Sequence, residues 1–184
     1  VQMFEDHAQP GRTRADALTA LISLKDAHAE GLRDKGLTDA DAMVRGTARG
    51  LLAKTNPKEA LPQLAEATLK GNVVDRQLAL ETLATLTESG TNAVIGQALD
   101  QLLAGEFPAE ATLELLEAAE KRAAGEIKAK VKEYQAARPA NDDLVGFRET
   151  LVGGDAAAGR RVFFEKTDVS CVRCHKVGET GGEV

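Results

Sequence analysis

Residues 45–52 read Arg-Gly-Thr-Ala-Arg-Gly-Leu-Leu, and residues 76–83 read Arg-Gln-Leu-Ala-Leu-Glu-Thr-Leu, so that Arg, Ala and Leu recur in the same order 31 residues apart. The same three residue types occur 31 residues further upstream, in residues 14–21, Arg-Ala-Asp-Ala-Leu-Thr-Ala-Leu. A fixed period of this length is typical of stacked supersecondary units. The repeat therefore predicts an array of similar helical units.

Each unit is predicted to be a helix, a short turn and a second helix. The expected pairs are 13–24 with 27–34, 40–54 with 57–70, and 74–88 with 91–104. Because one such unit cannot bury both of its faces, several must stack, which favours a helical-hairpin solenoid. The pattern resembles HEAT-like repeats, whose usual length is somewhat greater.

Local residues support these boundaries. Asn56-Pro57 and Thr91-Asn92 are typical of helix starts, whereas Gly71-Asn72 and Gly105 are typical of helix ends. The first twelve residues are expected to be irregular, because Pro10-Gly11 would interrupt a helix there.

After Pro108 the period slips by about one residue, and Ala111 and Leu115 take the repeat positions. Residues 109–137 are predicted to be helical with a break near Gly125. Asn141 is expected to cap a short helix through Leu151, with Gly153-Gly154 as a hinge after it. We therefore expect two domains: a helical-repeat domain over 1–152 and a second domain over 153–184.

The composition indicates an all-α protein. Aromatic residues make up 3% of the 184 residues, Trp is absent, and Ala, Leu, Glu and Lys are abundant. A formal net charge of −6 argues against a nucleic-acid partner, because phosphate binding needs a concentrated basic surface. No apolar run approaches the length of a membrane span.

A compact motif, Cys171-Val172-Arg173-Cys174-His175, contains both cysteines of the chain. A Cys-x-x-Cys-His run is the pattern to which c-type haem is attached: two thiols form thioether bonds to the porphyrin and the adjacent imidazole ligates the iron. Cys171, Cys174 and His175 are therefore the predicted cofactor-binding residues, and His175 is the predicted iron ligand.

Two other uses of this motif were weighed. A zinc site would need ligands from elsewhere, since no second Cys pair exists and the nearest other histidine is the distant His28. A redox dithiol formed by Cys171 and Cys174 is chemically allowed, but it would be expected in a strand-to-helix setting that the neighbouring residues do not indicate.

The residues on either side of the motif extend the pattern. Asp155 is a suitable N-cap for a helix that ends in Val162-Phe163-Phe164. Together with Gly159 and Gly181-Gly182-Glu183-Val184, these residues resemble the haem-binding domain of large planctomycete-type secreted or membrane-bound dehydrogenases. Such proteins commonly join a β-propeller resembling sugar dehydrogenases to HEAT-like repeats and a C-terminal cytochrome c.

The resemblance implies haem c as cofactor, a dehydrogenase domain in the same full-length protein and a redox partner protein. It also implies a distal Met ligand, which Met3 and Met43 cannot supply because they lie far upstream. We therefore expect the chain to be a fragment cut inside a cytochrome c domain, unable by itself to hold haem as a complete cytochrome does. Haem attachment of this type takes place outside the bacterial cytoplasm, so we expect a periplasmic or otherwise exported protein with its export signal upstream of Val1.

The preferred hypothesis is an electron-transfer module scaffolded by helical repeats. The rival is a protein-interaction scaffold whose Cys-x-x-Cys-His tail has no function in this chain. No catalytic constellation is recognised: His7 and His28 read as polar surface residues, and Asp39, Asp41 and the pair Asp142-Asp143 read as helix caps.

Overall fold

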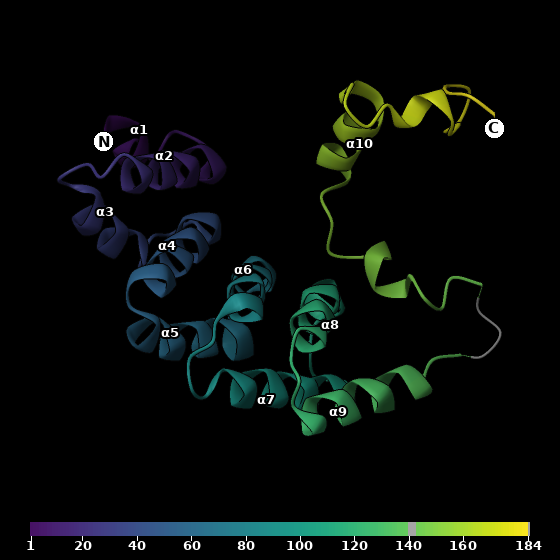
Figure 1. Ribbon diagram of the computed structural model, residues 1–184. Coiled ribbons are helices and arrows are strands. Elements are labelled where there is room, and N and C mark those ends of the chain that lie inside the picture. The colour runs from purple at the N-terminus through teal and green to yellow at the C-terminus, as the bar shows by residue number, and fades with distance from the viewer. Residues whose placement is uncertain (140–142, 184) are drawn as a thin grey trace.

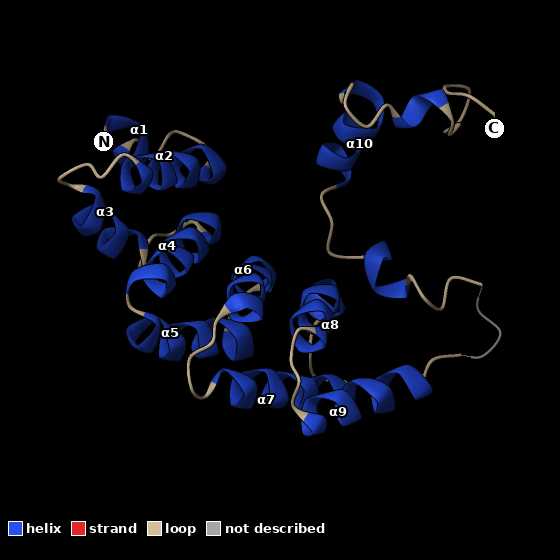
Figure 2. Cartoon of the chain, viewed as in Figure 1, coloured by secondary structure: helices blue, strands red, loops and turns tan. Residues whose placement is uncertain are grey.

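The structure is a computed structural model of the chain and describes residues 1–139 and 143–183. Within these ranges every regular element is helical, and the strand-like pairing found there is one isolated antiparallel bridge between Val177 and Thr180 (Figure 2). The all-α fold expected from the composition is therefore confirmed for the described part of the chain.

The helices follow one another with short connections up to residue 136. The α-helices are α1 Gln2–Glu5, α2 Gly11–Ser23, α3 Ala29–Gly36, α4 Ala42–Thr55, α5 Pro57–Lys70, α6 Val73–Thr85, α7 Thr91–Leu103, α8 Thr112–Glu120, α9 Gly125–Ala136 and α10 Ala156–Glu165. The 3₁₀ turns are η1 Ala109–Ala111, η2 Arg148–Leu151 and η3 Cys171–Arg173.

Capping side chains set several of these boundaries close to the predicted ones. Asn56 accepts a hydrogen bond from the amide of Glu59 at the start of α5, and Asp41 accepts one from the amide of Met43 at the start of α4. Asn72 follows the end of α5 as predicted, and it also caps α6 by accepting from the amide of Asp75 at 2.9 Å. The connection between α5 and α6 is short because Gly71 ends α5 and the adjacent Asn72 caps α6.

Helix α7 begins at Thr91, as predicted, but its N-cap is Gly90, with a backbone φ of 97°, and neither Thr91 nor Asn92 caps it. Thr91 is buried inside the helix and its hydroxyl donates to the carbonyl of Glu88 at 2.8 Å. The turn therefore relies on the left-handed conformation that glycine adopts without steric cost, and no side chain accepts from the first amides.

The helices form two rows that curve together (Figure 1). Helices α2, α4, α6 and α8, here called the inner row, pack one against the next on the concave side. Helices α3, α5, α7 and α9, the outer row, cover the inner row from behind, and α4 packs against α5 as α8 does against α9. Each row buries the apolar side of the other, which a single helix pair could not do.

Small residues allow the inner-row helices to approach closely. A Cβ added to Gly46 of α4 would lie 2.7 Å from the Cβ of Leu78 in α6. Ala48 and Ala79 are at most 1% exposed, and Leu83 is 0% exposed. The equivalent Ala17 and Leu21 in α2 are only half-buried, because α2 is the first helix of its row and Leu18 takes the buried position there.

Two of the three arginines spaced by 31 residues join neighbouring inner-row helices through ion pairs. Arg14 pairs with Asp39, which precedes α4, and Arg45 pairs with Asp75 in the first turn of α6, so that each joins one inner-row helix to the next. Arg76 instead donates to the carbonyls of Thr68, Leu69 and Gly71, and its guanidinium carbon lies 5.1 Å from the ring centroid of Phe107. The capping role predicted for Asp39 is corrected accordingly: its carboxylate accepts from Arg14 and from the amide of Asp41.

The first residues are more ordered than predicted. Helix α1 forms over Gln2–Glu5 and buries Phe4, which is 3% exposed. Arg14 holds it there, since its Nε donates to the carbonyl of Phe4 at 2.8 Å and its guanidinium lies over the Phe4 ring. The expectation of an irregular segment was wrong for residues 2–5, because the hydrogen bond and the cation–π contact with Arg14 hold α1 in place, whereas residues 6–10 are non-helical as expected.

The segment after α9 contains less helix than predicted. The predicted cap Asn141 and its neighbour Asp142 lie outside the described residues. From residue 143 the chain makes turns, and only η2 is helical before Gly153. None of the helices in the described ranges is both long enough and apolar enough to cross a lipid bilayer.

Candidate functional site

The Cys-x-x-Cys-His motif folds as one tight turn. Ser170 precedes it in the left-handed conformation, with a φ of 49°, and η3 begins at Cys171. The amides of Cys174 and His175 both donate to the carbonyl of Cys171, at 3.2 and 2.9 Å. Both cysteines and the histidine therefore belong to a single helical turn, as covalent attachment of one planar cofactor requires.

Helix α10 packs beside this turn. Asp155 accepts from the amide of Ala158 at 2.9 Å, which confirms the predicted N-cap, and this hydrogen bond holds the pKa of the Asp155 carboxyl below its ordinary value. Phe163 and Phe164 make an edge-to-face pair with ring centroids 4.9 Å apart. Aromatic side chains thus lie at the end of α10 that precedes the motif.

The loop after the motif folds back onto it. The amide of Gly182 donates to the carbonyl of Val172 at 2.9 Å, and Lys176 pairs with Glu183 at 2.6 Å. Gly181 has a φ of 117°, and a Cβ there would lie 2.2 Å from the carbonyl oxygen of His175. The loop can lie this close only because glycine has no side chain.

A shallow hollow of about 450 Å³ lies between the motif and this loop, lined by Cys174, His175, Lys176, Gly182 and Glu183. Cys171 is half-buried and Cys174 exposed, and both carry free thiols. His175 is exposed. The three predicted site residues are thus brought into one turn, with Cys174 and His175 exposed and lining the hollow.

A zinc site finds no support in this geometry. Across residues 1–139 and 143–183, no three or more His, Cys, Asp or Glu side chains are grouped so that they could hold a metal ion. His7 and His28 lie far from the motif in sequence, and His28 contacts Asp26 instead.

The described residues from 153 onward contribute no side chain to either buried apolar cluster. Instead they leave large apolar side chains open: Val162 is 47% exposed, Val169 53% and Val177 52%. Such surface is costly in water unless another apolar body covers it. A porphyrin ring is a body of that kind, and the two thiols and the imidazole of the turn are the donor set that attached haem needs, although the hollow at the turn is itself lined by Lys176, Gly182 and Glu183.

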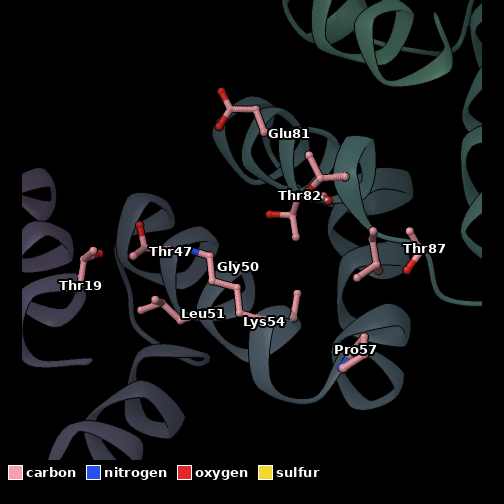
Figure 3. Close-up of a pocket in the computed structure, with 12 residues that line it drawn as sticks. Thr19, Thr47, Gly50, Leu51, Lys54, Pro57, Glu81, Thr82 and Thr87 are labelled. Carbon is pink, nitrogen blue, oxygen red and sulfur yellow. Dashed lines mark hydrogen bonds between the residues drawn. The ribbon is translucent and has the colours of Figure 1, made fainter. Parts of the chain in front are cut away.

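A second hollow, of about 530 Å³, was not anticipated from the sequence (Figure 3). It crosses the inner row, with Thr19 from α2, Gly50 and Lys54 from α4, and Thr82 from α6 among its lining residues. The Thr82 hydroxyl donates to the carbonyl of Leu78 at 3.0 Å, so its hydrogen is already used within α6. The repeat could have indicated this hollow from the sequence, because three of its lining residues, Thr19, Gly50 and Glu81, lie 31 residues apart.

Comparisons with protein-family models, with curated proteins and with solved structures found no match to this chain. The function is therefore argued from the residues and their arrangement.

Proposed function

We propose that the chain is an electron-transfer module that carries a c-type haem on the Cys171–His175 turn. Cys171 and Cys174 would form the two thioether bonds and His175 would be the axial iron ligand. The observation that carries the proposal is the single turn that presents two free thiols and an exposed imidazole, with the exposed Val169 and Val177 close to it in sequence. When bound, the haem would supply a one-electron ferric–ferrous couple.

The helical array is the scaffold in this proposal. We infer that residues 1–152 are a HEAT-like helical-hairpin solenoid and that residues 153–184 are the N-terminal part of a cytochrome c domain. The 31-residue spacing of Arg, Ala and Leu and the two packed rows of helices support the first part. The order of Asp155 cap, aromatic helix end and Cys-x-x-Cys-His turn supports the second.

The partners follow from the same resemblance. The electrons would come from a dehydrogenase domain of the full-length protein and pass to a redox partner protein in an exported, periplasmic-type compartment. The charges around the motif support a protein partner only weakly: five basic residues from Asp155 onward are matched by five acidic ones.

The decisive experiment is production of a version of the chain extended past Val184 in an exporting bacterial host that carries c-type haem attachment machinery. The expected product is red, gains the mass of one haem, and retains the haem after denaturation because thioether bonds are covalent. A colourless product with both thiols free to react with an alkylating reagent would overturn the proposal.

Matched variants separate the roles of the three residues. Cys171→Ala combined with Cys174→Ala should abolish covalent haem. His175→Ala should change the ligand field, so any haem still attached should have an altered Soret band and reduction potential. His28→Ala, which removes an exposed histidine outside the motif, serves as the control and should leave the spectrum unchanged.

A second candidate function, a binding scaffold, is favoured by one observation: the threonine-lined hollow across the inner row. Under that function, the variant lacking Cys171 and Cys174 would keep every protein with which the chain co-purifies. Gly50→Arg would instead fill the hollow and release that protein. The opposite pattern, loss with the cysteines and retention with Gly50→Arg, would favour electron transfer.

A further inference from the structure

The segment 143–153, here called the strap, joins the helical array to α10. It does not run free of the array, because η2 packs against α8. Two anchor points, one in η2 and one at Gly153, attach it to helices of both rows.

The first anchor is a nearly buried carboxylate. Glu149 is 8% exposed, accepts from the Tyr134 hydroxyl at 2.9 Å and pairs with Arg138 at 2.8 Å. The Arg138 guanidinium carbon also lies 5.4 Å from the centroid of the Tyr134 ring. Burying a carboxylate is costly unless it is paired, so this position of η2 depends on both partners from the end of α9.

The second anchor is a backbone contact that only glycine permits. The Gln77 side-chain amide, from α6, donates to the carbonyl of Gly153 at 3.2 Å and to the carbonyl of Glu110 at 2.9 Å. Gly153 has a φ of 81°, and a Cβ there would lie 2.1 Å from the Glu110 carbonyl oxygen. Any side chain at this position would push the strap away from η1.

The two anchors restrict α10. Gly154 is the sole residue between the attached Gly153 and Asp155, the N-cap of α10. The sequence predicted a hinge at Gly153-Gly154. Gly153 is held by its contacts with Gln77 and Glu110, so only the backbone dihedral angles of Gly154 can act as a hinge.

We infer that Glu149 and Gly153 are positioning residues that hold α10 and the Cys171–His175 turn at a fixed place relative to the helical array. The turn is thereby presented in one orientation and does not swing on a flexible linker. This inference does not require that haem is bound, since every contact that carries it lies between side chains and backbone of this chain.

The test is a distance measurement between two spin labels on the full chain. Cys171→Ser leaves Cys174 as the sole native thiol, and Lys58→Cys adds a second label on the exposed side of α5. The expected result for this parent protein is a single narrow distance distribution. Glu149→Ala and Gly153→Ala, at the two separate anchors, should each at least double its width.

Glu165→Ala is the control, because it removes an exposed glutamate from α10 without touching either anchor. Circular dichroism melting of each variant shows whether the array itself stays folded; Gly153→Ala alters no charge and tests the strap alone if Glu149→Ala melts early. A broad distribution in the parent protein, or one that stays narrow in Gly153→Ala, would overturn the inference. Loss of haem binding would leave it intact, because these samples contain none.

Discussion

Asp75, in α6, is the carboxylate that forms ion pairs with two arginines of α4. Its side chain is 7% exposed, yet its carboxylate pairs with two guanidinium groups, Arg45 at 2.5 Å and Arg49 at 2.6 Å. A buried ion pair contributes little net stability when it is intact, but removing one partner leaves charge uncompensated. Removing the Asp75 carboxylate should therefore weaken the packing of α4 against α6.

We predict that Asp75→Asn lowers the free energy of unfolding by about 3 kcal/mol, because two arginines lose their counter-charge. Urea unfolding followed by circular dichroism measures it. Asp16→Asn is the matched control: Asp16 pairs with Arg12 where the two side chains are 68% and 75% exposed, and its loss should change stability by less than about 0.5 kcal/mol. Equal losses in the two variants would contradict this account.

The pKa values of Asp75 and Asp39 determine how the stability of the fold depends on pH. Burial by itself raises the pKa of Asp75, but hydrogen bonds from Arg45 and Arg49 outweigh it and hold the pKa below the ordinary 3.8. The hydrogen bond from Arg14 likewise lowers the pKa of Asp39. A depressed folded-state pKa stabilises the fold above the unfolded-state value, and this stabilisation is lost as the pH falls through the folded-state pKa.

The free energy of unfolding should therefore be constant near neutral pH and decline below about pH 4. In the Asp39→Asn, Asp75→Asn double variant the decline over the same range should be shallower, because two of the protonating groups are gone. Unfolding curves at pH 3 to 6 measure both slopes. A double variant that loses stability as steeply as the wild-type chain would show that other carboxylates dominate the acid response.

At the scale of the helix, replacing glycine by alanine is expected to have opposite effects on stability at two positions. Gly46 lies where α4 meets α6, and an added Cβ would come within 2.7 Å of the Leu78 Cβ. Gly31 lies inside α3, and a Cβ there would meet no atom within 4 Å. Intrinsic helix propensity favours alanine at both positions, so packing alone separates them.

We predict that Gly31→Ala raises the free energy of unfolding by about 0.5 to 1 kcal/mol, since it reduces the entropy of the unfolded chain. Gly46→Ala should lower it by about 1 to 3 kcal/mol, because the inner-row helices must move apart. The two variants can be compared in one set of denaturation curves. A gain in stability at Gly46 would show that α4 and α6 are not in close contact.

For the whole molecule, stability resides in the helical array. The two buried apolar clusters draw their members from Phe4 to Ile127, and the described residues beyond 152 add none. The array should therefore fold without α10 and the Cys-x-x-Cys-His turn.

We predict that a chain ending at Val152 melts within about 4 °C of the full chain, because the main loss is the hydrogen bond from Gln77 to Gly153. Thermal melts followed at the helical signal measure it. A much larger shift would mean that the boundary between residues 152 and 153 divides one folding unit.

The prediction from sequence succeeded where the cause is local. Helix ranges up to residue 136 follow from Asn56, Asn72 and the apolar period, and these act through neighbouring backbone amides. It failed at Phe4 and at Gly90, where a contact with Arg14 and a left-handed backbone decide the outcome. The Cys171–His175 turn was located from sequence because its five residues are consecutive; the exposure of its side chains was not.

The sequence by itself determined that the chain is helical and that two thiols and an imidazole belong to one turn, because periodicity and adjacency act over a few residues. Only the tertiary structure decided which residue neutralises Arg14 or Arg45, that threonines from α2 and α6 share one hollow, and that Gly153 is an anchor. Those outcomes depend on how closely helices distant in sequence approach one another, and this distance is set by the packing of the whole array.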